Sequence, residues 1–202
     1  MLPMIVFEGL DGSGKDTQIT RVRNRLAKEG QNVMIVKYPK PGDTDIQRFL
    51  SGSAKPNPET LMRLFLDEME RDIPSLRPMR ETHILLVNRY YMSTIAYQGV
   101  FLGVERVRDE VLSRLEDDRL FYPDLTVYFD GDPVILLKRL SDKDVYERID
   151  LQNKVRGNYT ILFGDKRLSR EWCRVNAEED EEQVFLQVMS RVEGVLNLQK
   201  RS

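Results

Sequence analysis

Two glycines and a lysine near the N-terminus have the spacing of a phosphate-binding loop. Gly9, Gly14 and Lys15 fit the pattern G-x-x-x-x-G-K, between an apolar run and a stretch with helical periodicity. In such a loop, backbone N–H groups point inward at phosphate oxygens, and the following helix adds its positive dipole end. The lysine reaches the β and γ phosphates. A glycine-rich turn before a helix is the ordinary alternative. Strand, loop, helix and lysine together predict that the chain binds a nucleoside triphosphate.

The residue after the lysine departs from this pattern. A Ser or Thr hydroxyl normally follows and binds Mg²⁺, whereas this chain has Asp16. Thr17 cannot take that place, because one step along a helix rotates the side chain by about 100°. Either Asp16 supplies an anionic oxygen, which Mg²⁺ prefers, or it only complements the helix dipole and nucleotide binding is impaired.

The loop must be positioned by a sheet, and five short apolar runs are predicted to be its strands. They lie at residues 4–7, 33–36, 83–87, 125–129 and 172–175. Helices are expected at residues 18–29, 43–50, 59–71, 104–115, 134–140, 151–163 and 178–196, with another starting at 93–97. The helix at 59–71 is expected to break near Pro74, because proline removes a backbone donor. Short strands that alternate with helices indicate a parallel sheet covered on both faces, which binds ligands at the carboxyl ends of its strands.

Size and composition fit a single globular domain. The chain has 202 residues, of which 32% are charged and 41% hydrophobic, and its net charge of −2 predicts no bulk attraction to nucleic acid or to an anionic membrane. A single cysteine, Cys173, excludes an internal disulfide framework and suits the reducing cytoplasm. No apolar run has membrane-spanning length, and the first strand begins too early to leave room for a signal peptide.

Several separated segments together resemble the thymidylate kinase family. They are residues 7–15 at the start, Arg89-Tyr90 after the third predicted strand, Ser-Thr-Ile-Ala-Tyr-Gln-Gly at 93–99, residues 122–125 and residues 146–147. The resemblance implies one P-loop kinase domain over residues 1–202, with a three-layer α/β fold. It implies a five-stranded parallel sheet in the order 2-3-1-4-5, helices on both faces, a short lid at about residues 141–150 and a homodimer. The implied reaction is Mg²⁺-dependent transfer of the ATP γ-phosphoryl group to dTMP, giving dTDP.

The resemblance assigns residues to the phosphoryl donor. The lysine and the loop amides would hold the ATP phosphates, while basic residues flanking the lid would close over ATP. A run of charges is also an ordinary solvated surface. The residues implied to bind ATP are Gly9, Gly12, Ser13, Gly14, Lys15, Asp16, Thr17, Arg139, Lys143 and Arg148.

The resemblance also assigns residues to the acceptor. Phe65 would stack on the base, Gln98 would contact the base edge, and Tyr146 would lie beneath the sugar. From periodicity alone, Phe65 is equally well a core residue. Asp11 would accept a hydrogen bond from the 3′-hydroxyl group, and Arg89 would hold the acceptor phosphate. The implied acceptor site is Asp11, Lys40, Phe65, Met69, Arg89, Gln98 and Tyr146, and the implied catalytic residues are Lys15, Arg89 and Asp11.

Departures from the family pattern leave alternatives open. Asn88 stands where the family has a metal-side aspartate, and we hypothesise that it and Asp16 are linked metal-binding changes. Met69 stands where an arginine usually reaches the base, and Lys40 and Pro41 replace the usual loop arginine. A kinase for another deoxynucleotide and a catalytically weak nucleotide-binding protein are therefore alternatives. A nucleoside kinase is a third, although its carboxylate base would be expected at position 88.

Overall fold

The five predicted strands form one parallel sheet in a computed structural model that describes residues 1–42, 44–53, 55–140 and 145–199. The order is β2-β3-β1-β4-β5, which confirms the expected fold. The strands are β1 (Met4–Gly9), β2 (Val33–Lys37), β3 (Ile84–Asn88), β4 (Leu125–Asp130) and β5 (Glu171–Asn176). Each observed strand includes the predicted run or differs from it by one residue at an end.

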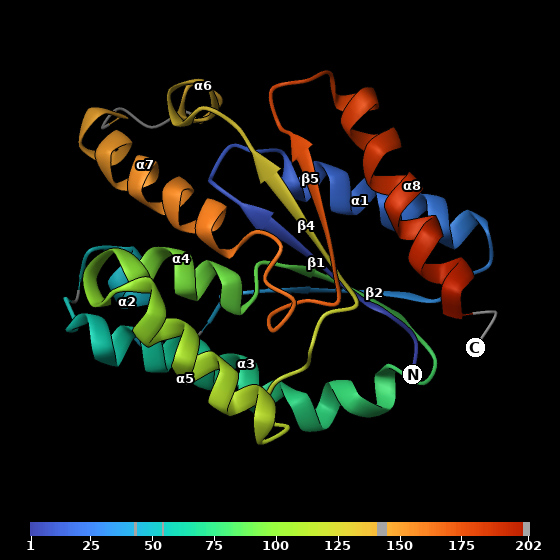
Figure 1. Cartoon of the computed structure of the whole chain (residues 1–202), viewed down its shortest axis with the longest axis horizontal. Helices are drawn as coiled ribbons and strands as arrows, with labels where there is room; N and C mark the ends of the chain where they lie inside the picture. Colours follow the sequence, from blue (N-terminus) through green and yellow to red (C-terminus); the bar gives the residue numbers. More distant parts are fainter. Residues whose placement is uncertain (43, 54, 141–144, 200–202) are drawn as a thin grey trace.

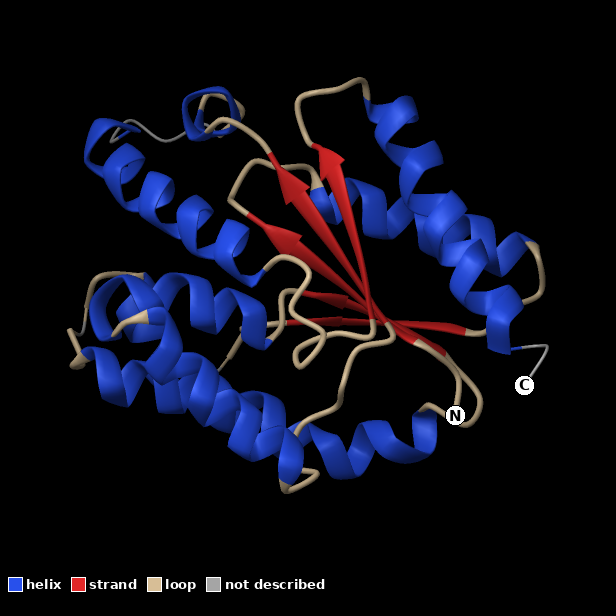
Figure 2. Cartoon of the chain, viewed as in Figure 1, coloured by secondary structure: helices blue, strands red, loops and turns tan. Residues whose placement is uncertain are grey.

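Helices cover both faces of the sheet and make three layers (Figures 1 and 2). Helices α1 and α8 pack together on one face, whereas α4 lies on the other face, with α3, α5 and α7 packed against it. The helices are α1 (Lys15–Lys28), α2 (Thr44–Leu50), α3 (Pro58–Met79), α4 (Tyr91–Leu102), α5 (Val104–Glu116), α6 (Pro133–Leu137), α7 (Val145–Leu162) and α8 (Glu181–Gln199).

The central strand brings the functional segments to one edge. All residues of β1, β3 and β4 are buried, as expected for parallel strands covered on both faces. In the register of β1 with β3, Phe7 lies beside Asn88, and in the register with β4, Gly9 lies beside Phe129. The loop after β1 and the residues after β3 therefore leave the sheet side by side, at the edge where such folds bind ligands.

The expected break near Pro74 is wrong, because α3 continues to Met79 with Pro74 and Pro78 inside it. Both prolines lie on the exposed side of the helix, while Ile73 is buried in the core and Leu76 packs against it. Burial of the apolar face offsets the lost backbone hydrogen bonds, since tertiary packing supplies most of the stability of helices in proteins.

Other helix boundaries also differ from expectation: α1 begins at Lys15 rather than at residue 18, and α8 spans Glu181–Gln199 rather than residues 178–196. Helix α6 ends at Leu137 rather than at residue 140, because the N–H groups of Arg139 and Leu140 donate to carbonyls three residues earlier and form tighter turns. Helix α7 begins at Val145 rather than at residue 151, so residues 145–150 of the predicted lid are helical, whereas residues 141–144 lie outside the described chain. None of the described helices combines the length and apolar character needed to cross a bilayer.

Candidate active site

The loop between β1 and α1 has a backbone that only glycine fits at two positions. Gly12 has φ +75°, and a Cβ atom there would lie 2.2 Å from the carbonyl oxygen of Leu136. Gly14 has φ +82° and is the N-cap residue of α1. A side chain at Gly12 would collide with α6, and one at Gly14 would force a left-handed conformation that L-residues rarely adopt. Gly14, the second glycine of the motif, and Gly12, which lies between the two motif glycines, are thus requirements of this fold.

The lysine of the motif lies within its own loop. Lys15 is buried, and its Nζ donates to the carbonyl oxygens of Gly9 (3.0 Å) and Leu10 (2.6 Å) and to Ser13 Oγ (3.0 Å). Burial, together with the nearby charge of Arg89, lowers the pKa of Lys15 to about 7. A bound phosphate would favour the charged form of this lysine and raise its pKa again.

This pKa predicts that nucleotide binding takes up a proton. At about pH 8.5, Lys15 is mostly neutral in the free protein, whereas phosphate contact requires the ammonium form, so ATP binding should take up close to one proton. Near pH 6 the lysine is already mostly charged in the free protein, so proton uptake by Lys15 on ATP binding should be small. Calorimetric titration with ATP in buffers of different ionisation enthalpy measures this uptake. A binding heat that is independent of the buffer at the higher pH would contradict the prediction.

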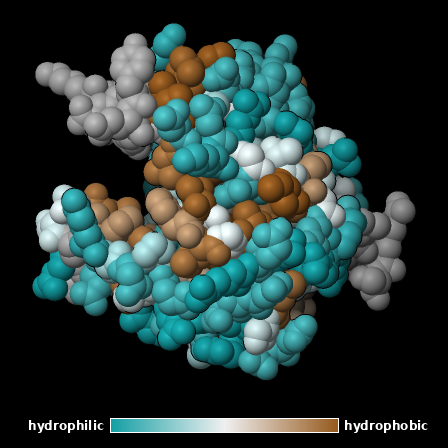
Figure 3. All heavy atoms as spheres, turned by 60° about the vertical axis from the view of Figure 1, so that its left-hand side comes forward, coloured by the Kyte–Doolittle hydropathy of each residue, from teal (hydrophilic) through white to brown (hydrophobic). Residues whose placement is uncertain are grey.

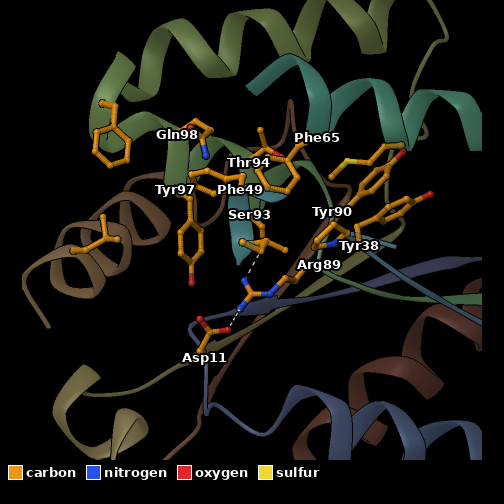
Figure 4. Close-up of a pocket in the computed structure, with 15 residues that line it drawn as sticks. Asp11, Tyr38, Phe49, Phe65, Arg89, Tyr90, Ser93, Thr94, Tyr97 and Gln98 are labelled. Carbon is orange, nitrogen blue, oxygen red and sulfur yellow. Dashed lines mark hydrogen bonds and ion pairs between the residues drawn. The ribbon is translucent and has the colours of Figure 1, made fainter. Parts of the chain in front are cut away.

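Arg89 is held between the loop and α4. Its Nη2 lies 2.6 Å from Asp11 Oδ1, its Nη1 donates to Ser93 Oγ at 3.2 Å, and its guanidinium carbon lies 5.5 Å from the centre of the Tyr97 ring (Figure 4). Its backbone has φ 63°, which is uncommon for a residue other than glycine. Because the surroundings fix both backbone and side chain, Arg89 is preorganised to bind an anionic group.

Glu8 holds this turn in place, although the sequence analysis did not assign it a role. The carboxylate is fully buried and accepts hydrogen bonds from the backbone N–H of Tyr90 (2.7 Å), from Ser93 Oγ (2.5 Å) and from Tyr159 Oη (2.9 Å). Burial raises the pKa of Glu8, and the hydrogen bond from Ser93 and the charge of Arg89 oppose this. The carboxylate thus joins β1, the turn after β3, and α7. The position of Glu8 directly after the apolar run of β1 was the sequence signal that could have identified it.

Replacing Glu8 with glutamine should lower the free energy of unfolding by about 2–4 kcal/mol. The amide would keep one acceptor oxygen but turn an NH₂ group toward donors inside a buried network. Urea unfolding followed by circular dichroism measures the change. The exposed Glu116→Gln on α5 is the control and should stay within about 0.5 kcal/mol of the parent protein. A loss for Glu8→Gln no larger than that of the control would contradict the role given to Glu8.

Two cavities meet at the turn after β3. A cavity of about 670 Å³ lies over the loop, and a second of about 370 Å³ lies between α3 and α4. Figure 3 turns this side of the molecule forward and shows apolar residues gathered around a hollow. Asp11 and Arg89 belong to the walls of both cavities. The aromatic residues of the smaller cavity are Tyr38, Phe49, Phe65, Tyr90, Tyr97 and Phe101.

The smaller cavity brings together most of the residues that were assigned to the acceptor. Phe65 and Met69 project into it from α3 and Gln98 from α4, as Figure 4 shows for Phe65 and Gln98. Gln98 is only 4% exposed, and its Oε1 atom has no hydrogen-bond partner among the described residues. Lys40 turns elsewhere, because its ammonium pairs with Asp72. The side chain of Tyr146 lies outside the part of the chain that the structure describes.

The larger cavity contains the residues that were assigned to the phosphoryl donor, with three exceptions. Gly9 does not line the cavity, but its carbonyl oxygen accepts a hydrogen bond from Lys15, which does. Arg139 lines the cavity and donates to the carbonyl oxygens of Ala177 (2.8 Å) and Gly12 (3.4 Å). Lys143 and the side chain of Arg148 lie outside the described residues. The loop residues that line this cavity are Gly12, Ser13, Gly14, Lys15, Asp16 and Thr17.

The two residues that depart from the usual metal-binding pattern are in direct contact. Asn88 Nδ2 donates to Asp16 Oδ1 at 2.7 Å, and Lys37 Nζ lies 3.0 Å from the same oxygen. Asn88 is 2% exposed, and the structure shows no hydrogen-bond partner for its Oδ1 among the residues it describes. The sequence analysis did not assign Lys37 to the site. Its position at the carboxyl end of β2, where such sheets bind ligands, was the available signal.

This donor set fits Mg²⁺, which takes oxygen ligands and typically only one or two from the protein. A carboxylate oxygen at position 16, and an amide oxygen at position 88 that has no partner among the described residues, supply that chemistry. The described residues contain no group of three or more His, Cys, Asp or Glu that could hold a metal ion. Phosphate oxygens and water would therefore complete the coordination shell.

Comparisons with known proteins agree with this architecture. The family model for thymidylate kinase matches residues 7–188. A probable thymidylate kinase of Archaeoglobus fulgidus is 30% identical over 206 residues, covering 98% of this chain and 99% of the relative. A thymidylate kinase of a Wolbachia strain from Brugia malayi is 32% identical over 201 residues, covering 93% and 94%, and one of Thermosipho africanus is 29% identical over 202 residues, covering 94% and 96%. The chain therefore belongs to the thymidylate kinase family of phosphotransferases.

Proposed function

We propose that the protein is a nucleoside monophosphate kinase that transfers the γ-phosphoryl group of ATP to dTMP in a Mg²⁺-dependent reaction, giving dTDP. One observation carries the proposal: the cavity over the phosphate-binding loop and the aromatic cavity share Arg89 and Asp11. A donor phosphate in the first and an acceptor phosphate in the second would meet at this shared wall. The names of the relatives support dTMP as the acceptor.

Residues that line the two cavities would carry out phosphoryl transfer together with a bound Mg²⁺ ion. The loop amides and Lys15 would hold the β and γ phosphates, and the planar guanidinium of Arg89 would hold the acceptor phosphate. The acceptor oxygen is already anionic, so no general base is required. When bound, Mg²⁺ neutralises charge on the transferring group, and Asp16 and Asn88 are the residues that would hold it. Closure of the predicted lid would exclude water from the donor.

The residues of the smaller cavity would select the base. The ring of Phe65 offers a stacking surface, and the buried amide of Gln98 supplies hydrogen-bonding groups for the base edge. The third residue assigned to the base, Met69, has an apolar side chain that cannot donate a hydrogen bond. Base selection would therefore rest on stacking and on one amide. Asp11 would orient the sugar through its 3′-hydroxyl group while it pairs with Arg89.

An acceptor panel tests the proposal. ADP release is measured with ATP and Mg²⁺ against ribo- and deoxynucleoside monophosphates, with EDTA as the control. Turnover confined to dTMP, or to dTMP and dUMP, supports the proposal, and Gln98→Leu should then raise the KM for dTMP more than it lowers kcat. Preference for another deoxynucleotide contradicts dTMP as the acceptor. ATP binding without turnover across the panel indicates a catalytically weak nucleotide-binding protein.

The proposal includes a homodimer in the cytoplasm, as the family resemblance implies. Sedimentation velocity at micromolar concentration tests the oligomeric state. A species with twice the mass of the chain is expected, and a monomer would contradict this part of the proposal.

A further inference from the structure

We propose that the protein has exchanged the chemistry of its two metal-binding positions, and that Lys37 competes with the divalent cation for Asp16. Asp16 supplies the carboxylate oxygen at the position that normally carries a hydroxyl, and Asn88 supplies a neutral amide oxygen at the position where the family resemblance implies a carboxylate. This inference rests on the proposed function, since it concerns the cation that accompanies the nucleotide.

The contacts at the loop show that the two positions act together. Asp16 lies in the first turn of α1, and Asn88 is the last residue of β3, 72 positions further along the chain. Their side chains nevertheless meet through the 2.7 Å hydrogen bond from Asn88 Nδ2 to Asp16 Oδ1. This bond orients the amide and leaves the buried Oδ1 of Asn88 without a partner in the described part of the molecule. A buried oxygen in that condition gains from any cation or donor that binds beside it.

The two substitutions together keep the total charge of the two metal-binding positions unchanged. The usual hydroxyl and carboxylate together carry one negative charge, and so do Asp16 and Asn88. The side chains at positions 16 and 88 are in contact. An aspartate at both positions would therefore place two adjacent carboxylates beside the triphosphate, and their like charges would repel. An amide at position 88 avoids that repulsion and still offers an oxygen ligand.

Lys37 completes the arrangement from the neighbouring strand. It pairs in register with Asn88, and its ammonium lies 3.0 Å from the same Asp16 oxygen that accepts from the asparagine. Both Lys37 and Asp16 line the cavity over the loop, and both side chains are more than half exposed. A divalent cation on this Asp16 oxygen would repel the lysine at this distance, so binding there requires the ammonium to leave. The lysine can then turn toward phosphate oxygens in the same cavity.

The test measures Mn²⁺ binding to the complex with a non-hydrolysable ATP analogue, by electron paramagnetic resonance of the free ion. Asp16→Ser and Asp16→Asn should each weaken Mn²⁺ binding by at least about tenfold. The double variant Asp16→Ser/Asn88→Asp restores a hydroxyl and a carboxylate and should return to within about threefold of the parent protein. Asp45→Ser removes an exposed carboxylate from the first turn of α2 and controls for helix-dipole effects. It should leave Mn²⁺ binding unchanged.

The competition has a test of its own. Lys37→Gln keeps a long polar side chain without the charge and should tighten Mn²⁺ binding by about threefold or more. Unchanged or weaker binding by this variant overturns the competition.

The exchange is overturned if Asp16→Ser binds Mn²⁺ as tightly as the parent protein, or if the double variant binds no better than Asp16→Ser alone. The measurement needs no acceptor and no turnover. A protein that fails the acceptor panel can therefore still show the predicted pattern of Mn²⁺ binding, which separates failure of the proposed function from failure of this inference.

Discussion

Replacing Lys15 with methionine is expected to lower kcat by about a thousandfold. In the proposed reaction the ammonium would bring a positive charge to the β and γ phosphates, and methionine keeps the length of the side chain without that charge. Loss of the hydrogen bonds to Gly9, Leu10 and Ser13 should lower stability as well, so the folded fraction of the variant is checked by circular dichroism. Single-turnover transfer from ATP measures the change.

Lys28→Met is the matched control for this variant. Lys28 is an exposed residue in the last turn of the same helix, far along α1 from the loop, and its replacement should leave kcat within about twofold. If Lys15→Met keeps kcat within tenfold of the parent protein, the loop does not act on the transferring phosphoryl group.

The second large effect is expected for Arg89→Lys, which should lower kcat/KM for the acceptor by about 100- to 1,000-fold. A lysine retains the charge but cannot contact Asp11, Ser93 and an acceptor phosphate with one planar group. The variant would also lose the contact of the Arg89 guanidinium with the ring of Tyr97. Initial rates with varied acceptor at saturating ATP give the change in kcat/KM, and the KM for ATP should change less.

Arg80→Lys provides the matched control at the opposite end of the sheet. Arg80 is buried, its Nη2 lies 2.7 Å from Asp124 Oδ2, and it lines neither cavity. This variant should lower thermal stability and leave kcat/KM within about threefold. If Arg80→Lys and Arg89→Lys reduce kcat/KM equally, the effect of Arg89 is on folding and not on binding the acceptor.

The sequence predicted the features that depend on local pattern. The five apolar runs became strands, and the motif from Gly9 to Lys15 became a loop between a strand and a helix. The sheet order came from the family resemblance, because periodicity alone does not say which strands are neighbours. The continuation of α3 through Pro74 could not be predicted, since it depends on burial of Ile73 against the rest of the fold.

Contacts between distant segments could not be read from spacing. The hydrogen bonds of Glu8 join residues up to 151 positions apart, and those of Asp16 reach residues on β2 and β3. Lys40 was assigned to the acceptor because it replaces a loop arginine, yet Asp72 holds its ammonium elsewhere. Only the three-dimensional structure shows which charged group each of these side chains meets.

The most direct test of the account follows the γ-phosphoryl group itself. The protein is incubated with γ-labelled ATP, Mg²⁺ and dTMP, and the products are separated by chromatography. We expect the label to appear in dTDP, EDTA to abolish the transfer, and little label to appear as inorganic phosphate. Label released only as inorganic phosphate, or ATP left intact beside bound dTMP, would contradict the claim that the two cavities meeting at Arg89 form a phosphoryl-transfer site.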